Sequence, residues 1–227
     1  MKITKFALFT CALLLSCQAL LGQSKTSVGF ILSPTLANFR DAPTFFTKSW
    51  MPTLSAGTAL RVQSKKAFFF QAELSYERKG FNLKGVQWTD FNAAPFGEKF
   101  TIRHQFDYLI FTPTVGFATR GKVHFEGSFG VFCGYLALRK DAYGFKPPFA
   151  SSANIQPNIN DFNRFDVGTT TRAGVGFDLK EKWSLTINAV GNVGFSKVYK
   201  PVLGASDDFG RDKTVSLGLQ LGLFYKI

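Results

Sequence analysis

The sequence is poor in the residues on which catalytic and covalent chemistry often depends. It contains three cysteines and two histidines in 227 residues. Cys11 and Cys17 fall in an N-terminal apolar segment that we expect to be processed, so Cys133 alone remains and no intramolecular disulfide forms. Cys133 falls on the apolar side of an expected strand, where we interpret it as a small buried hydrophobic residue rather than a nucleophile.

Charged residues are also sparse, at 19% of the sequence, although the net charge is +12. The sequence has no long run of lysine and arginine, and its basic residues are scattered through expected turns and loops. A nucleic-acid-binding protein concentrates its positive charge on one patch or stripe. The charge therefore does not indicate a nucleic-acid partner.

After residue 22 the sequence has no apolar run that approaches the roughly 20 residues of a membrane-spanning helix. The one earlier run, Phe6 to Leu21, follows a basic start that includes Lys2 and Lys5. A basic start before a short apolar run predicts a secretory signal peptide. We expect a signal peptide in residues 1–22 and a single domain in residues 23–227. Cleavage after Gly22, cleavage after Ala19 and lipidation at Cys17 remain alternatives.

The sequence has apolar and polar residues in alternation instead. Every odd position from Val215 to Ile227 is apolar, and the even positions are mostly small or polar. Because side chains alternate across a strand, this pattern predicts one long strand with an apolar face. A free edge of this kind would promote aggregation, so we expect the strand to pair with the first strand and close a barrel.

Eight segments share the alternation and predict eight strands. They cover residues 27–35, 52–63, 67–78, 104–118, 123–138, 165–179, 183–197 and 214–227. Short turns alternate with long connections, which we place at residues 36–51, 79–103, 139–164 and 199–212. This rhythm is typical of an all-β, eight-stranded antiparallel up-and-down transmembrane β-barrel. It places all the tight turns at one end of the barrel, the tight-turn end, and all the long connections at the other, the long-loop end. The fourth segment alternates poorly and contains Pro113, so we assign no facing to it.

The alternation also fits a soluble barrel with its apolar face inside. Three observations favour an apolar face directed at outer-membrane lipid. The other face is mostly Gly, Ser and Thr, with too few charges for a water-exposed surface. Aromatic residues gather near the tight-turn end, as in the interfacial girdle of a membrane barrel. The expected signal peptide would export the chain from the cytoplasm. The girdle residues are Phe68, Phe177, Trp183 and Tyr225. We therefore expect the protein in the cell outer membrane.

Three segments carry a resemblance to a known family. They are Glu73-Leu74-Ser75-Tyr76-Glu77-Arg78-Lys79-Gly80, Phe106-Asp107-Tyr108-Leu109 to Pro113, and Phe165-Asp166-Val167-Gly168 to Gly174-Val175-Gly176. They resemble the PorT-like outer-membrane β-barrel family of Bacteroidota, and the resemblance covers essentially the whole mature chain. The resemblance implies an eight-stranded outer-membrane barrel. One branch of the PorT-like family is tied to type IX protein secretion. Pro113 arrives later than the family pattern places it.

Several charged side chains project into the lumen in the expected register. The predicted interior set is Arg61, Glu73, Glu126, Asp166 and Arg172, accompanied by Glu77 and Asp178. Glu73 and Arg172 fall at a similar depth, so we expect an interior ion-pair network that plugs the barrel. A proton or solute path is the alternative, which the narrow lumen of eight strands disfavours.

The two histidines do not indicate a catalytic or metal site. His104 falls near the long-loop end and His124 just after a tight turn, so the barrel separates them. We expect a local hydrogen bond between His124 and Glu126, no cofactor or metal, and no enzymatic activity.

We expect a structural or interaction role in which the outer loops form the binding surface. Their aromatic residues favour an interfacial girdle or loop packing over a binding surface; they are Phe45, Phe46, Trp50, Trp88 and Phe91. Participation in type IX secretion is the alternative that the resemblance implies, and a small pore or an outer-membrane enzyme are further alternatives. The expected partners are outer-membrane lipid, the barrel-assembly machinery and secretion or surface proteins.

Overall fold

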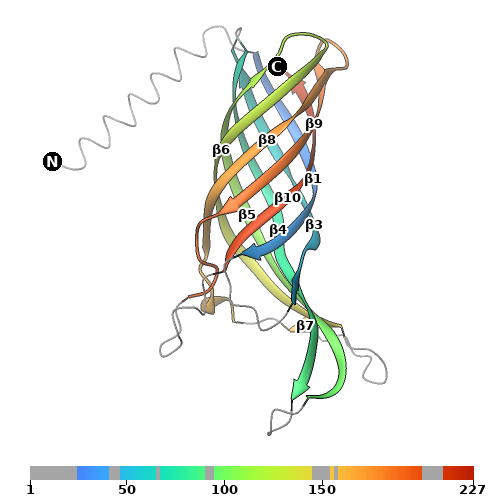
Figure 1. The fold of residues 1–227 in the computed structure, drawn as a ribbon. Helices are drawn as coiled ribbons and strands as arrows, with labels where there is room; N and C mark the ends of the chain where they lie inside the picture. The colour runs from blue at the N-terminus through green and yellow to red at the C-terminus, as the bar shows by residue number, and fades with distance from the viewer. Residues whose placement is uncertain are drawn as a thin grey trace, which may run out of the picture.

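The computed structural model describes residues 25–40, 47–64, 67–89, 95–144, 154–155, 158–200 and 212–227 (Figure 1). The expected signal peptide, with Cys11 and Cys17, lies outside the described residues. No helix in these ranges has the length and apolar character needed to cross a membrane.

The described residues form ten strands and one short 3₁₀ helix. In chain order they are β1 (Lys25–Arg40), β2 (Thr47–Ser49), β3 (Met51–Gln63), β4 (Phe68–Thr89), β5 (Pro95–Ala118), β6 (Val123–Gly144), β7 (Asn154–Ile155), η1 (Ile159–Asp161), β8 (Phe165–Asp178), β9 (Trp183–Gly194) and β10 (Lys213–Lys226).

Eight of these strands pair in a closed, barrel-like ring, called the barrel below (Figure 1). The order around the ring is β1, β3, β4, β5, β6, β8, β9 and β10, and every pairing is antiparallel. The short strands β2 and β7 add to β4 and β6 at the long-loop end. The up-and-down order predicted from the sequence is therefore confirmed.

The pairing of β1 with β10 closes the ring. It runs from Ser27 opposite Lys226 to Arg40 opposite Lys213. This confirms that the alternating final segment pairs with the first strand, so neither strand is left as a free edge.

The apolar side chains of the ring point outward. Phe30 is 73% exposed and Leu219 is 55% exposed, whereas Ser216 and Gln220 are buried inside. This is the facing expected for a barrel surrounded by lipid. It also corrects the interpretation of Cys133, which is exposed on the outer wall and not buried.

The facing of β5, which the sequence left open, is now defined. Leu109 and Phe111 point outward, whereas Phe106, Tyr108 and Ile110 are buried inside. The alternation is poor because β5 carries large apolar residues on both faces, and because its register with β6 shifts between Asp107 and Tyr108.

The prediction of a long loop over residues 79–103 is wrong. β4 continues to Thr89 and β5 begins at Pro95, and the two strands form a ribbon that projects from the barrel (Figure 1). Gly80, Gly85 and Pro95, residue types that disfavour regular strands, are accommodated within this ribbon. Gly80 takes a φ of +152°, a conformation that favours glycine, and the register shifts around Gly85, as at a β-bulge. Pro95 opens its strand, where a missing N–H is tolerated.

Candidate functional site

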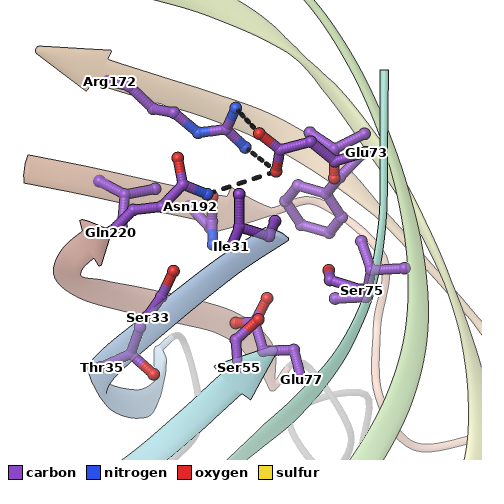
Figure 2. A pocket seen from close by; sticks show the side chains of 14 residues that line it. Ile31, Ser33, Thr35, Ser55, Glu73, Ser75, Glu77, Arg172, Asn192 and Gln220 are labelled. Atoms are coloured by element: carbon purple, nitrogen blue, oxygen red, sulfur yellow. Dashed lines mark hydrogen bonds and ion pairs between the residues drawn. The ribbon is translucent and has the colours of Figure 1, made fainter. Parts of the chain in front are cut away.

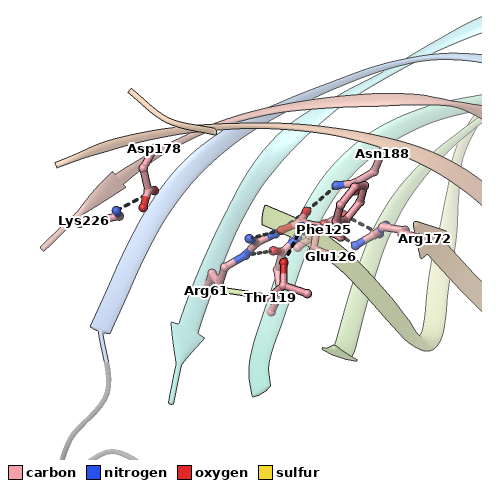
Figure 3. A network of polar contacts seen from close by, with 10 residues as sticks. Arg61, Thr119, Phe125, Glu126, Arg172, Asp178, Asn188 and Lys226 are labelled. Atoms are coloured by element: carbon pink, nitrogen blue, oxygen red, sulfur yellow. Dashed lines mark hydrogen bonds and ion pairs between the residues drawn. The ribbon is translucent and has the colours of Figure 1, made fainter. Parts of the chain in front are cut away.

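The tight-turn half of the lumen contains an ion pair between Arg61 and Glu126 (Figure 3). Arg61 Nη1 lies 2.7 Å from Glu126 Oε2, and Arg61 Nε donates to Gln71 at 2.6 Å. Asn188 donates to the same carboxylate at 2.7 Å. The guanidinium also lies over the ring of Phe69, at 4.4 Å from its centroid. Each charge is thus compensated although both side chains are buried.

A second ion pair joins Arg172 and Glu73 (Figure 2). Arg172 Nη1 and Nη2 donate to the two Glu73 oxygens at 2.6 and 2.8 Å, the bidentate geometry that makes such pairs strong. Gln71 and Gln220 donate to the same carboxylate. Because Gln71 contacts both Arg61 and Glu73, the two ion pairs form one connected network.

Towards the long-loop end, Lys79 forms an ion pair with Asp166 that the sequence did not predict. Lys79 is 1% exposed, and its Nζ lies 2.9 Å from Asp166 Oδ2. Thr214 donates to the same oxygen at 2.7 Å, and the ammonium lies over the Phe132 ring. Lys79 was assigned to a loop. Continuing the alternation from Glu77 by two residues would have placed it inside.

Beyond this pair, a cluster of large side chains fills the lumen, and we call it the aromatic plug. Arg139 lies over two of its rings, at 4.1 Å from the centroid of Phe162 and 5.0 Å from that of Phe106. The plug comprises Phe39, Phe81, Phe106, Tyr108, Ile110, Phe132, Leu136, Phe162 and Val198. Its residues come from β1, β4, β5 and β6 and from the segments flanking β8 and β9, so it spans the barrel from wall to wall.

The polar network and the aromatic plug leave little free space between them. One cavity of about 20 Å³ borders Glu73, Glu77, Arg172 and Phe132 (Figure 2). A cavity of this size holds about one water molecule. The described residues therefore leave no open path along this part of the lumen.

The two remaining interior carboxylates of the sequence prediction have different surroundings. Glu77 is 5% exposed and accepts a hydrogen bond of 3.0 Å from Ser216. Asp178 lies at the tight-turn rim, where its partly exposed carboxylate pairs with Lys226 at 2.8 Å (Figure 3).

The histidines lie apart, and each has different neighbours. His104 Nδ1 lies 2.8 Å from Asp141 Oδ1, and Arg139 donates to the same carboxylate at 2.9 Å. The expected bond between His124 and Glu126 is not formed among the described residues, because Arg61 and Asn188 occupy that carboxylate. No group of three or more potential metal ligands occurs in the described ranges.

Of the expected loop aromatics, only Trp50 can be placed, and it is 42% exposed. Phe45, Phe46 and Phe91 lie outside the described residues. Trp88 belongs to β4, but its side chain is outside the described part.

Several solved outer-membrane proteins are similar to this chain at low sequence identity. The attachment invasion locus protein Ail of Yersinia pestis is 14% identical, with 90% of this chain and 99% of that chain covered and a TM-score of 0.43. Neisserial surface protein A is 10% identical, with 89% and 97% covered and a TM-score of 0.46. The outer membrane protease OmpT of Escherichia coli is 8% identical, with 90% and 96% covered and a TM-score of 0.42. No curated protein matches the sequence.

The sequence model of one family, the outer membrane protein beta-barrel domain, matches residues 21–200. This range includes seven of the eight ring strands, and the eighth, β10, completes the closed sheet. The chain therefore belongs to the outer membrane protein beta-barrel domain family and is a protein of the outer membrane.

Proposed function

We propose that the protein is an eight-stranded transmembrane barrel with a closed lumen, which anchors the ribbon of β4 and β5 at the cell surface as a binding element. The observation that carries this proposal is the contrast between the two ends of the ribbon. Near the barrel, β4 pairs with β3 up to Glu77, and β5 pairs with β6 from Thr101 onward. Residues 86–89 and 95–100 pair only with each other among the described residues.

An isolated two-stranded ribbon is marginally stable in water, and its outer edges carry unpaired N–H and C=O groups. A partner that adds a strand to such an edge satisfies these groups and gains affinity from main-chain hydrogen bonds. A filled barrel suits this role, because it holds the ribbon on a rigid base without serving as a channel.

The loop-end histidine supports a binding role over a catalytic one. His104 and Asp141 have the spacing of a catalytic pair, but Arg139 also binds the Asp141 carboxylate. Within the described contacts, no serine, threonine or cysteine side chain is bonded to His104. We therefore propose a non-enzymatic protein, assembled by the barrel-insertion machinery through β10.

Site-specific crosslinking in intact cells tests the binding role. A photoreactive residue at Lys84, which is exposed at the base of the ribbon, should give a discrete crosslinked product. The same residue at Arg120, exposed in a tight turn at the opposite end, is the matched control. The product should disappear when residues 85–100 are replaced by Asn-Gly, which suits a two-residue turn between the paired Lys84 and Thr101. No product at Lys84, or an unchanged product after this trimming, would overturn the proposal.

A second candidate is a PorT-like role in type IX protein secretion. It is supported by contacts between residues of the three sequence segments that resemble the PorT-like family. Lys79 of the first motif pairs with Asp166 of the third, and it lies 5.5 Å from the ring centroid of Tyr108 in the second. Deleting the gene should then retain type IX cargo inside the cell, and the intact gene should restore its release. Normal cargo release by the deletion strain would reject this candidate.

A further inference from the structure

The outer wall of the barrel carries a groove at the long-loop end, across β3, β4 and β5. It has a volume of about 500 Å³ and opens outward. Its lining includes Leu54, Ala56, Tyr76, Arg78, Arg103 and Gln105. These six side chains lie on the outward-facing side of the strands. The lining also includes Met51, Pro52 and Thr53 of β3.

The groove changes from apolar to basic along the barrel axis. Tyr76 pairs across the sheet with Ala56 on one side and Leu109 on the other, so its cross-strand neighbours are apolar, while its hydroxyl accepts a hydrogen bond of 3.4 Å from Arg78. The next outward pair is Arg78 with Asp107, and Asn82 with Arg103 lies beyond it. Arg103 is therefore four residues past Asp107 on β5, about 13 Å along the strand.

The two arginines differ in how their charge is compensated. Arg78 donates to Asp107 through Nε at 2.6 Å and through Nη2 at 3.1 Å, which leaves Nη1 for another acceptor. Arg103 is exposed and has no hydrogen bond or ion pair with any described residue. Among the described residues, the positive charge at the basic end of the groove is therefore uncompensated.

We propose that this groove binds a phosphate-bearing lipid of the outer leaflet. The long-loop end of an outer-membrane barrel faces outward, so the groove lies where the apolar band meets the headgroups. An acyl chain fits beside Leu54, Ala56 and Tyr76, and the phosphate then lies against Arg103 and the free Nη1 of Arg78. Charge complementarity and the order of apolar and basic residues along the groove both select an anionic amphiphile.

Arg103→Gln tests the site, because it removes the charge from an exposed position without leaving a buried partner. The protein is purified in detergent and mixed with diphosphorylated lipid A, and bound lipid is counted by native mass spectrometry. Each basic residue near an anionic membrane surface contributes about 1 kcal/mol, so the variant should bind about fivefold more weakly than the parent. Arg120→Gln, at the tight-turn end, should bind like the parent.

Two further measurements separate phosphate recognition from general adhesion of lipid to the wall. Dephosphorylated lipid A should bind the parent at least as weakly as diphosphorylated lipid A binds Arg103→Gln, because it loses the contacts with both arginines. Inorganic phosphate alone should give no retained adduct, because it lacks the acyl chains that occupy the apolar end. Equal affinity of the parent and Arg103→Gln, equal binding of the dephosphorylated lipid, or retention of inorganic phosphate alone would overturn the proposal. A shift in gel mobility on heating verifies that both variants are folded.

Discussion

Arg172 and Glu73 are an ion pair whose two partners depend on each other. Glu73 is 2% exposed and accepts hydrogen bonds from Arg172, Gln71 and Gln220. Removing both charges from such a site is often nearly neutral, whereas removing one leaves the other buried and uncompensated. The effect of a mutation on the stability of the protein therefore depends on whether it removes one charge of the pair or both.

Arg172→Ala should destabilise the protein by about 3–5 kcal/mol, because Glu73 keeps its charge in the buried interior with Gln71 and Gln220 as its remaining side-chain donors. The free energy of unfolding is measured by denaturant titration in detergent or lipid, with tryptophan fluorescence as the signal. Arg120→Ala, in an exposed turn, is the control and should change it by less than about 0.5 kcal/mol.

The double variant Arg172→Ala with Glu73→Gln completes the test at this residue pair. It should be more stable than Arg172→Ala alone, because the buried carboxylate is gone. A single Arg172→Ala variant as stable as the parent would show that the pair does not contribute to holding the barrel together.

The eight strands of the barrel could be predicted from the sequence, but the ribbon formed by β4 and β5 could not. The odd-numbered apolar residues from Val215 onward predict both the strand and its facing. The side of a strand that faces lipid must be apolar, so every second residue in the sequence is apolar. Residues 79–103 were mistaken for a loop because Gly80 and Gly85 indicate breaks, whereas a ribbon accommodates them as a positive-φ residue and a bulge.

The interior was partly predictable for the same reason. The period of two placed Arg61 and Glu126 on one face of their strands, but it did not say which side chains meet across the lumen. The aromatic plug was not predicted, because Phe106 and Tyr108 are apolar residues on the inner face, where an outer-membrane barrel is expected to be polar. Its aromatic side chains come from strands distant in sequence, and only the closure of the barrel brings them together.

The facing of β10 predicts a depth-dependent cost for a charge on the outer wall. Leu221 pairs with Leu32 near the middle of the apolar band, whereas Leu36 lies close to its long-loop edge. Leu221→Lys should cost about 2–4 kcal/mol and Leu36→Lys about 0–1 kcal/mol, because the ammonium reaches water only from the edge. Unfolding in phospholipid vesicles measures both values. Equal costs at the two depths would contradict the assigned position of the membrane.

For the whole molecule, the layers of the lumen act in series. The polar network, the cavity of about 20 Å³ and the aromatic plug follow one another along the axis, so a solute would have to displace each of them. A single weakened layer leaves the others in place. The barrel is therefore expected to remain closed even when its stability is reduced by a point substitution.

This closure is tested by conductance in planar lipid bilayers. The purified protein should give no channel steps at moderate voltage, because no described segment of the lumen between the network and the plug admits hydrated ions. A porin inserted under the same conditions gives the positive control, and a heat-dependent shift in gel mobility verifies that the silent protein is folded. Arg172→Ala should also be silent, since the aromatic plug still spans the lumen. Reproducible steps from the folded parent would mean that the interior rearranges in the membrane, and the proposal of a closed anchor would then be wrong.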